Sequence, residues 1–150
     1  MSKDQMLDFA NLDTEEASDK PFELEIVHPT TKKGLGVFVS VIGSESKEIK
    51  GLVRRKLNSD RMREFEARRK NQPVEPNTIE EDEGESIDLA MKCAKGWRTV
   101  INGKSEPVVM VAGERLEFNP DNLKAWLARF AWARVQVING ASELGNFLGN

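Results

Sequence analysis

Alternation of apolar and polar residues predicts a β-hairpin in the first third of the chain. Phe22, Leu24 and Ile26 alternate with glutamates, which is the period of two of a half-buried strand. After Pro29 and a glycine-containing turn, residues 37–42 form a run rich in β-branched side chains, which favours a second strand. Because so few residues separate the two strands, we expect them to pair.

A long helix is predicted after the hairpin, with Ser44 as a candidate N-cap. Apolar residues recur at intervals of three and four from Ile49 to Leu57 and then less regularly to Phe65. The helix, residues 47–70, is rich in Lys and Arg. We expect its apolar stripe to lie across one face of the hairpin while the basic side chains face water.

A linker and a second helix follow. Two prolines over about residues 71–77 prevent a continuous helix. Thr78 and Glu81 have the spacing of a capping box, and Gly96 is the expected stop of the helix that they begin.

The last third predicts short strands and two more helices. Turn signals and short apolar runs between residues 97 and 118 favour short strands or extended segments. Asn119 followed by Pro120 is a helix-start signal. A last helix is expected over about 131–146, with a weak point where Asn139 precedes glycine.

Together these elements predict an α+β fold in which an N-terminal β-hairpin packs against a bundle of about four helices. Residues 1–20 are acidic and polar, so we expect a flexible arm or one short helix there. The length of 150 residues suits one domain, which we place at 21–150.

Charge is distributed unevenly, although the net charge is only −3. Residues 1–25 carry eight acids and two bases, residues 47–70 ten bases and four acids, and residues 75–88 seven acids and no base. Blocks of opposite sign can pair between subunits or within one subunit. We expect homo-oligomers, with closed rings among the forms, in which residues 47–70 meet residues 75–88 of a neighbour.

Composition and motifs argue against an enzyme. The only histidine, His28, precedes a proline, and the only cysteine is Cys93. The sequence has no phosphate-binding glycine loop, no serine-nucleophile motif and no zinc-ligand spacing. We expect His28 to be a turn residue and Cys93 a small buried hydrophobe, and we predict no catalytic residue, cofactor or metal site.

The basic block also raises the question of nucleic-acid binding. The pI of about 5.4, the acids within the block and its single aromatic residue, Phe65, favour a solvated helix face instead. The sequence has no run of eighteen apolar residues, so we expect no membrane span. The amino terminus has neither the apolar region nor the cleavage site of a secretion signal, so we do not expect secretion. We therefore expect neither nucleic acid nor membrane as the partner.

The carboxy-terminal third carries a series of short motifs. They are Gly96-Trp97-Arg98-Thr99-Val100, Leu116-Glu117-Phe118-Asn119-Pro120-Asp121-Asn122, Trp126-Leu127, Arg134-Val135-Gln136 and Gly145-Asn146-Phe147-Leu148. In the front half, His28-Pro29-Thr30-Thr31 precedes the long Arg-rich helix. Over about residues 20–150, this pattern resembles the tail assembly chaperones of long-tailed bacteriophages. The apolar segment 105–113 is an addition to the family's pattern.

The resemblance implies a protein without enzyme activity in the host cell cytoplasm. Such a chaperone binds the tape measure protein, keeps its long helices soluble while the tail tube assembles, and is not retained in the virion. The alternatives are a structural virion protein of the tail or head-tail connector and a nucleic-acid-binding accessory protein.

A surface for a helical client would use aromatic anchors. The candidates are Trp97, Trp126, Phe130, Trp132 and Phe147, each of which could fill the core instead. On one continuous helix, Trp126 and Trp132 would point about 120° apart. We therefore expect at least one of these two tryptophans to face outward unless the chain turns between them.

Overall fold

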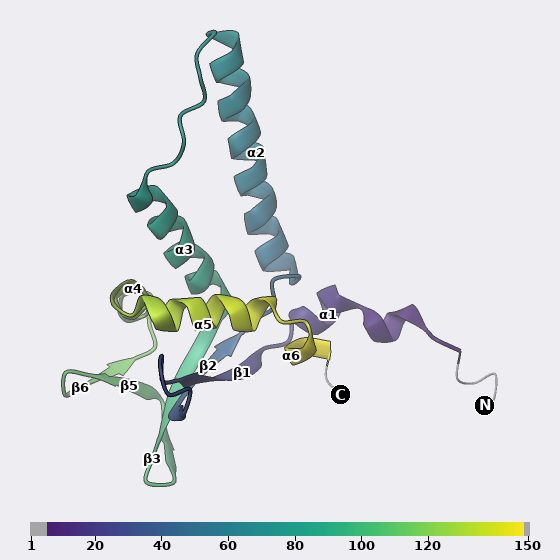
Figure 1. Ribbon diagram of the computed structural model, residues 1–150. Coiled ribbons are helices and arrows are strands. Elements are labelled where there is room, and N and C mark those ends of the chain that lie inside the picture. The colour runs from purple at the N-terminus through teal and green to yellow at the C-terminus, as the bar shows by residue number, and fades with distance from the viewer. Residues whose placement is uncertain (1–5, 149–150) are drawn as a thin grey trace.

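A computed structural model describes residues 6–148 and has the predicted α+β fold (Figure 1). The strands β1 (Phe22–Val27) and β2 (Gly34–Val41) form the antiparallel hairpin, and β3 (Ala94–Ile101) and β4 (Lys104–Glu106) extend it to a four-stranded sheet. A separate two-stranded sheet consists of β5 (Val108–Val111) and β6 (Glu114–Glu117). The helices α3 (Ile79–Cys93), α4 (Pro120–Arg129) and α5 (Ala131–Ser142) pack with the hairpin sheet.

His28 organises the turn between β1 and β2. Its Nδ1 accepts hydrogen bonds from the backbone N–H groups of Thr30 and Thr31, both at 3.2 Å. The carbonyl of His28 accepts from the N–H of Lys32, which has a φ of 63°. The expectation that His28 is a turn residue is confirmed.

The core lies between the hairpin sheet and the three packed helices. Both the sheet and the helices contribute side chains that are almost completely buried. They are Ile26, Val39, Val41, Cys93, Leu127 and Val137. Gly140 of α5 packs so closely on β1 that an added Cβ would lie 2.8 Å from Cδ2 of Leu24. A glycine in the last turn of α5 therefore allows this helix to approach the sheet.

Side-chain caps fix the starts of two helices as predicted. Thr78 caps α3 by accepting from the N–H of Glu81 at 3.1 Å, and Asn119 caps α4 by accepting from the N–H of Asn122 at 2.8 Å. Each bond satisfies one of the donors that a helix start leaves free. The expected last helix is shorter than predicted, because α5 ends at Ser142 and a separate turn of helix, α6 (Gly145–Leu148), follows.

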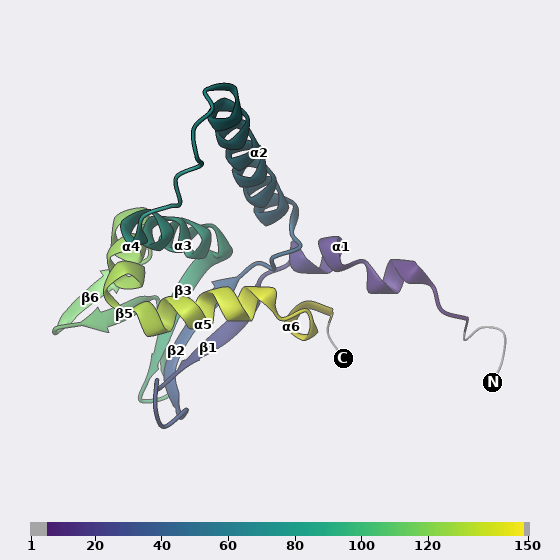
Figure 2. The same ribbon diagram turned by 45° about the horizontal axis from the view of Figure 1, so that its top comes forward.

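The long helix α2 (Lys47–Arg69) departs from its expected position. Its N-cap is Ser46 and not Ser44, and Ile49 is its only buried residue. Its apolar stripe does not cover the hairpin, because α2 projects away from the sheet (Figures 1 and 2). The second helix also ends earlier than expected, since Ala94 pairs with Val41 and so belongs to β3.

The amino-terminal segment has two parts. The short helix α1 (Thr14–Ser18) is joined to the body: the carbonyl of Ser18 accepts from the N–H of Gly43 at 2.8 Å, and Glu15 lies 3.3 Å from Lys50 of α2. Before α1, a 3-10 helix, η2 (Phe9–Leu12), contains no buried residue. We call residues 6–12 the arm; it extends away from both the sheet and α2 (Figures 1 and 2). Residues 1–5 of the expected arm lie outside the described residues.

Candidate partner-binding surfaces

The candidate aromatic residues divide into core and surface positions. Trp97 and Trp126 are buried and lie edge to face, with ring centroids 5.6 Å apart. The indole N–H of Trp97 also donates to the carbonyl of Leu116 at 3.1 Å. Phe147 is half-buried against Phe22. Trp97 and Trp126 are therefore core residues, and Phe147 packs α6 onto β1.

The chain turns at Phe130, between α4 and α5, and Trp132 nevertheless faces outward. Phe130 has non-helical dihedral angles, with φ −110° and ψ 76°. Inside this corner, Nη1 of the buried Arg134 donates to the carbonyl of Leu127 at 3.0 Å, so the two helices keep a fixed relation. Trp132 stays 37% exposed and lies edge to face against the half-buried Phe130, at 6.3 Å.

These two aromatic residues border a shallow pocket of about 200 Å³. We call it the aromatic pocket; its lining residues are Ile26, Leu35, Val37, Val109, Met110, Trp126, Phe130 and Trp132. Leu35, Met110 and Trp132 are the exposed members, and they come from β2, β5 and α5. At the edge, the guanidinium of Arg129 lies 5.4 Å from the centre of the Phe130 ring. An apolar floor with an aromatic and cationic edge suits an apolar partner segment that carries an acid.

A second apolar surface lies between the two projecting helices. This α2–α3 groove has a volume of about 450 Å³. Leu52, Val53 and Leu57 of α2 and Leu89 of α3 form its apolar walls, and charged side chains of both helices form its rim. The sequence correctly placed Leu52, Val53 and Leu57 on one stripe, but the prediction that the hairpin covers them is wrong.

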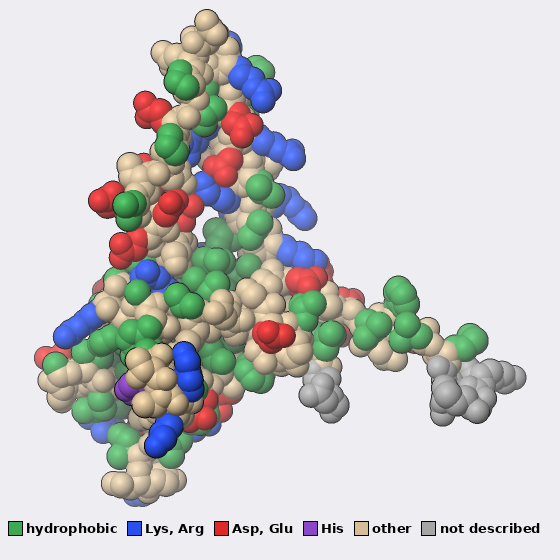
Figure 3. All heavy atoms as spheres, in the orientation of Figure 1, with side chains coloured by type: hydrophobic (Ala, Val, Ile, Leu, Met, Phe, Trp, Pro, Cys, Tyr) green, Lys and Arg blue, Asp and Glu red, His purple; other side chains and the backbone are tan. Residues whose placement is uncertain are grey.

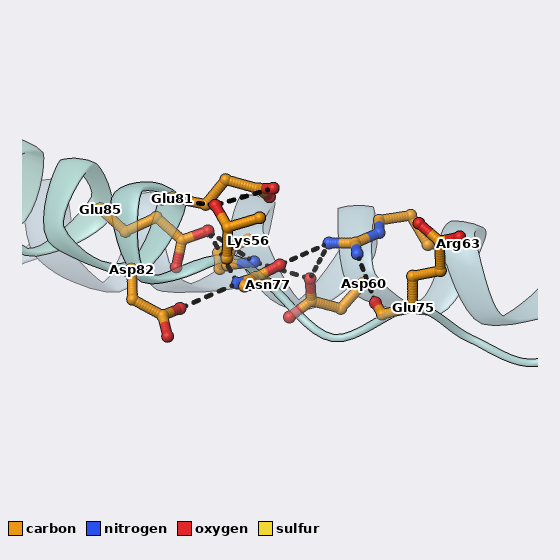
Figure 4. A network of polar contacts seen from close by, with 9 residues as sticks. Lys56, Asp60, Arg63, Glu75, Asn77, Glu81, Asp82 and Glu85 are labelled. Carbon is orange, nitrogen blue, oxygen red and sulfur yellow. Dashed lines mark hydrogen bonds and ion pairs between the residues drawn. The ribbon is translucent and has the colours of Figure 1, made fainter.

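A polar network joins α2 to α3 at the rim of the groove (Figure 4). The ammonium of Lys56 lies 2.7 Å from a carboxylate oxygen of Asp60 and 3.0 Å from one of Glu85 of α3. Its hydrogen bond to Asp60, and to a smaller extent that to Glu85, raises the pKa of Lys56. Arg63 donates to the side chain of Asn77 at 3.0 Å. The basic and acidic blocks therefore meet within one subunit, and their contact between subunits stays a prediction.

The side of α2 that carries Lys50 is basic and partly apolar. Spacings of three and four residues place Lys50, Arg54, Leu57, Arg61 and Phe65 on one side of the helix, which we call the basic face of α2. Phe65 is 61% exposed, and Leu57, which lies between this face and the groove, is 54% exposed. Figure 3 shows Lys and Arg side chains in a row along α2, whereas acids gather on the α3 side.

Cys93, the only cysteine of the sequence, lies in the core and not on these surfaces. It is buried, as predicted, and burial raises the pKa of its thiol to about 11. Over residues 6–148, no three His, Cys, Asp or Glu side chains are grouped closely enough to hold a metal ion. In the same part of the chain, none of the helices has the length and apolar character needed to span a membrane.

No family model, curated protein or solved structure matches this chain.

Proposed function

We propose that this protein is a phage tail assembly chaperone that binds the tape measure protein in the host cell cytoplasm and is not retained in the virion. The observation that carries the proposal is the aromatic pocket, in which Leu35, Met110 and Trp132 expose apolar surface around a hollow. Exposed apolar side chains grouped around a concave site are typical of a surface that a partner covers.

The pocket suits single side chains of a client helix. Its volume of about 200 Å³ is too small for a whole helix, so the client helix would lie across the rim and place apolar side chains into the hollow. Trp132 would cover one flank of that helix. An acidic residue of the client could pair with Arg129, whose guanidinium stands over the Phe130 ring.

The sequence motifs support the proposal through their structural positions. The His28-Pro29-Thr30 series forms the hairpin turn, and Asn119 begins α4. The Arg-rich helix follows the hairpin as it does in the family that the sequence resembles. These residues shape the fold, whereas client binding is assigned to Phe130, Trp132 and their neighbours in the pocket. Trp126 contributes to the floor, and Phe147 is not part of the pocket.

Co-expression with the tape measure protein tests the proposal. Met110→Glu places a charge at the pocket rim, where the side chain is 44% exposed, and should reduce the amount of soluble complex about tenfold or more. Val100→Glu is the matched control: Val100 is 37% exposed on β3 and does not line the pocket. Equal complex formation by the two variants would overturn the assignment of the pocket.

Two further measurements separate the proposal from its alternatives. Peptide mass analysis of purified particles should lack this protein, and its presence at high copy number would identify a structural virion protein instead. A mobility shift with duplex or single-stranded nucleic acid at low salt, weakened by added salt, would favour the accessory-protein alternative.

A further inference from the structure

The arm exposes an unusual amount of apolar surface. Its apolar residues are Met6, Leu7, Phe9 and Leu12, and all four are exposed, Phe9 to 76%. Phe9 and Leu12 are three residues apart on the 3-10 helix η2, so they project on the same side. Asp8 is the only charged residue of the arm, and Asp13 and two acids of α1 follow it without an intervening base. The arm thus combines an apolar side with negative charge.

The basic face of α2 has the complementary composition. Leu57 and Phe65 are exposed apolar residues there, and Arg54 and Arg61 lie between and beside them. The same kind of pairing already exists at the base of this face, where Glu15 of α1 lies 3.3 Å from Lys50. The arm and the part of α2 that follows Lys50 therefore carry opposite charges, and both expose apolar side chains.

The arm that covers the basic face of α2 could belong to the same subunit or to a second copy. The direction of the arm favours the second copy. Asp13 caps α1 by accepting from the N–H of Glu16 at 3.0 Å, and Asp8 caps η2 by accepting from the N–H of Ala10 at 2.9 Å. Each cap orders its own short helix, and both ribbon views show the arm leading away from α2 of its own subunit (Figures 1 and 2). An arm in this direction does not cover the basic face of α2 of its own subunit.

We propose that residues 6–12 of one copy bind the basic face of α2 of a second copy. Phe9 and Leu12 cover Leu57 and Phe65, while Asp8 lies near Arg54 and Arg61. The contact is head to tail, so repetition gives a ring when the rotation closes and an open chain when it does not. This self-association goes beyond the proposed function because it requires no client.

Sedimentation equilibrium of the full chain over a concentration series tests the proposal. The arm variant Phe9→Ser/Leu12→Ser and the face variant Arg61→Glu/Phe65→Ser should each raise the dissociation constant of self-association about tenfold or more. All four side chains are exposed, so the fold should persist, which circular dichroism checks. Ile79→Ser is the matched control, since Ile79 is 81% exposed at the start of α3 and should leave association unchanged.

Mixing the two defective variants gives the decisive result. The arm variant keeps an intact face and the face variant keeps an intact arm. A mixture should therefore form a 1:1 heterodimer at concentrations at which each variant alone is monomeric. A mixture that stays monomeric overturns the proposal, as does a wild-type protein that is monomeric at every concentration, which would place the arm on its own subunit or leave it free. None of these measurements includes the tape measure protein, so their failure is distinct from failure of the proposed function.

Discussion

Replacement of Trp126 by alanine should destabilise the protein more than the same replacement of Trp132. Trp126 is only 6% exposed and lies edge to face against Trp97 at 5.6 Å. Truncation of a buried tryptophan to alanine costs about 3–5 kcal/mol, and loss of the aromatic pair contributes within that range. Taking about 4 kcal/mol for Trp126→Ala, a chain of this length should show a decrease in Tm of roughly 8–16 °C.

Thermal and urea unfolding, followed by far-UV circular dichroism, measure this effect. Trp132→Ala is the natural comparison, because Trp132 is already 37% exposed and its removal leaves no enclosed cavity. We expect it to cost less than half as much stability and to weaken the complex with the tape measure protein instead. Equal stability losses, or a loss below about 1 kcal/mol for Trp126→Ala, would refute the division into core and surface tryptophans.

Three other substitutions test separate parts of the structure. Burial raises the pKa of the Cys93 thiol from 9.0 to about 11. The stability difference between wild type and Cys93→Ala should therefore be constant below about pH 8. From there to about pH 11 it should shift against the wild type, because the unfolded thiol ionises while the folded thiol stays neutral; pH-dependent urea unfolding measures this shift. Gly140→Val should destabilise by about 1–3 kcal/mol through the clash with Leu24, and Leu24→Ala in the same chain should recover part of the loss in a double-mutant cycle. Asn119→Ala should cost about 1 kcal/mol by removing the α4 cap, whereas Asn119→Ser should retain most of the stability in the same assay.

The elements that the sequence predicted well depend on local chemistry. The alternation from Phe22 to Ile26 and the turn after Pro29 specify the hairpin, since strand period and turn residues act within a few positions. The caps at Thr78 and Asn119 were likewise readable, because a side-chain oxygen bonds to an N–H group only two or three residues ahead.

The candidate site was less accessible to sequence reasoning because it is assembled over long distances. Leu35, Met110 and Trp132 meet only after β2, β5 and α5 are brought together, and no local pattern marks Leu35 or Met110 as surface residues. Helical spacing placed Leu57 on one stripe with Ile49, but such spacing defines which residues share a side and not which element covers them.

The two partner-binding surfaces should differ in how strongly a partner alters the molecule. The aromatic pocket has buried core residues such as Ile26 and Trp126 as its floor, so a client binds a surface that the fold already fixes. The helix α2 has only Ile49 buried, and exposed pairs such as Lys56–Glu85 join it to α3. Exposed ion pairs contribute little stability, so α2 can open locally at low free-energy cost. A second copy that covers α2 would therefore stabilise this helix by mass action, whereas a client in the pocket would leave it unchanged.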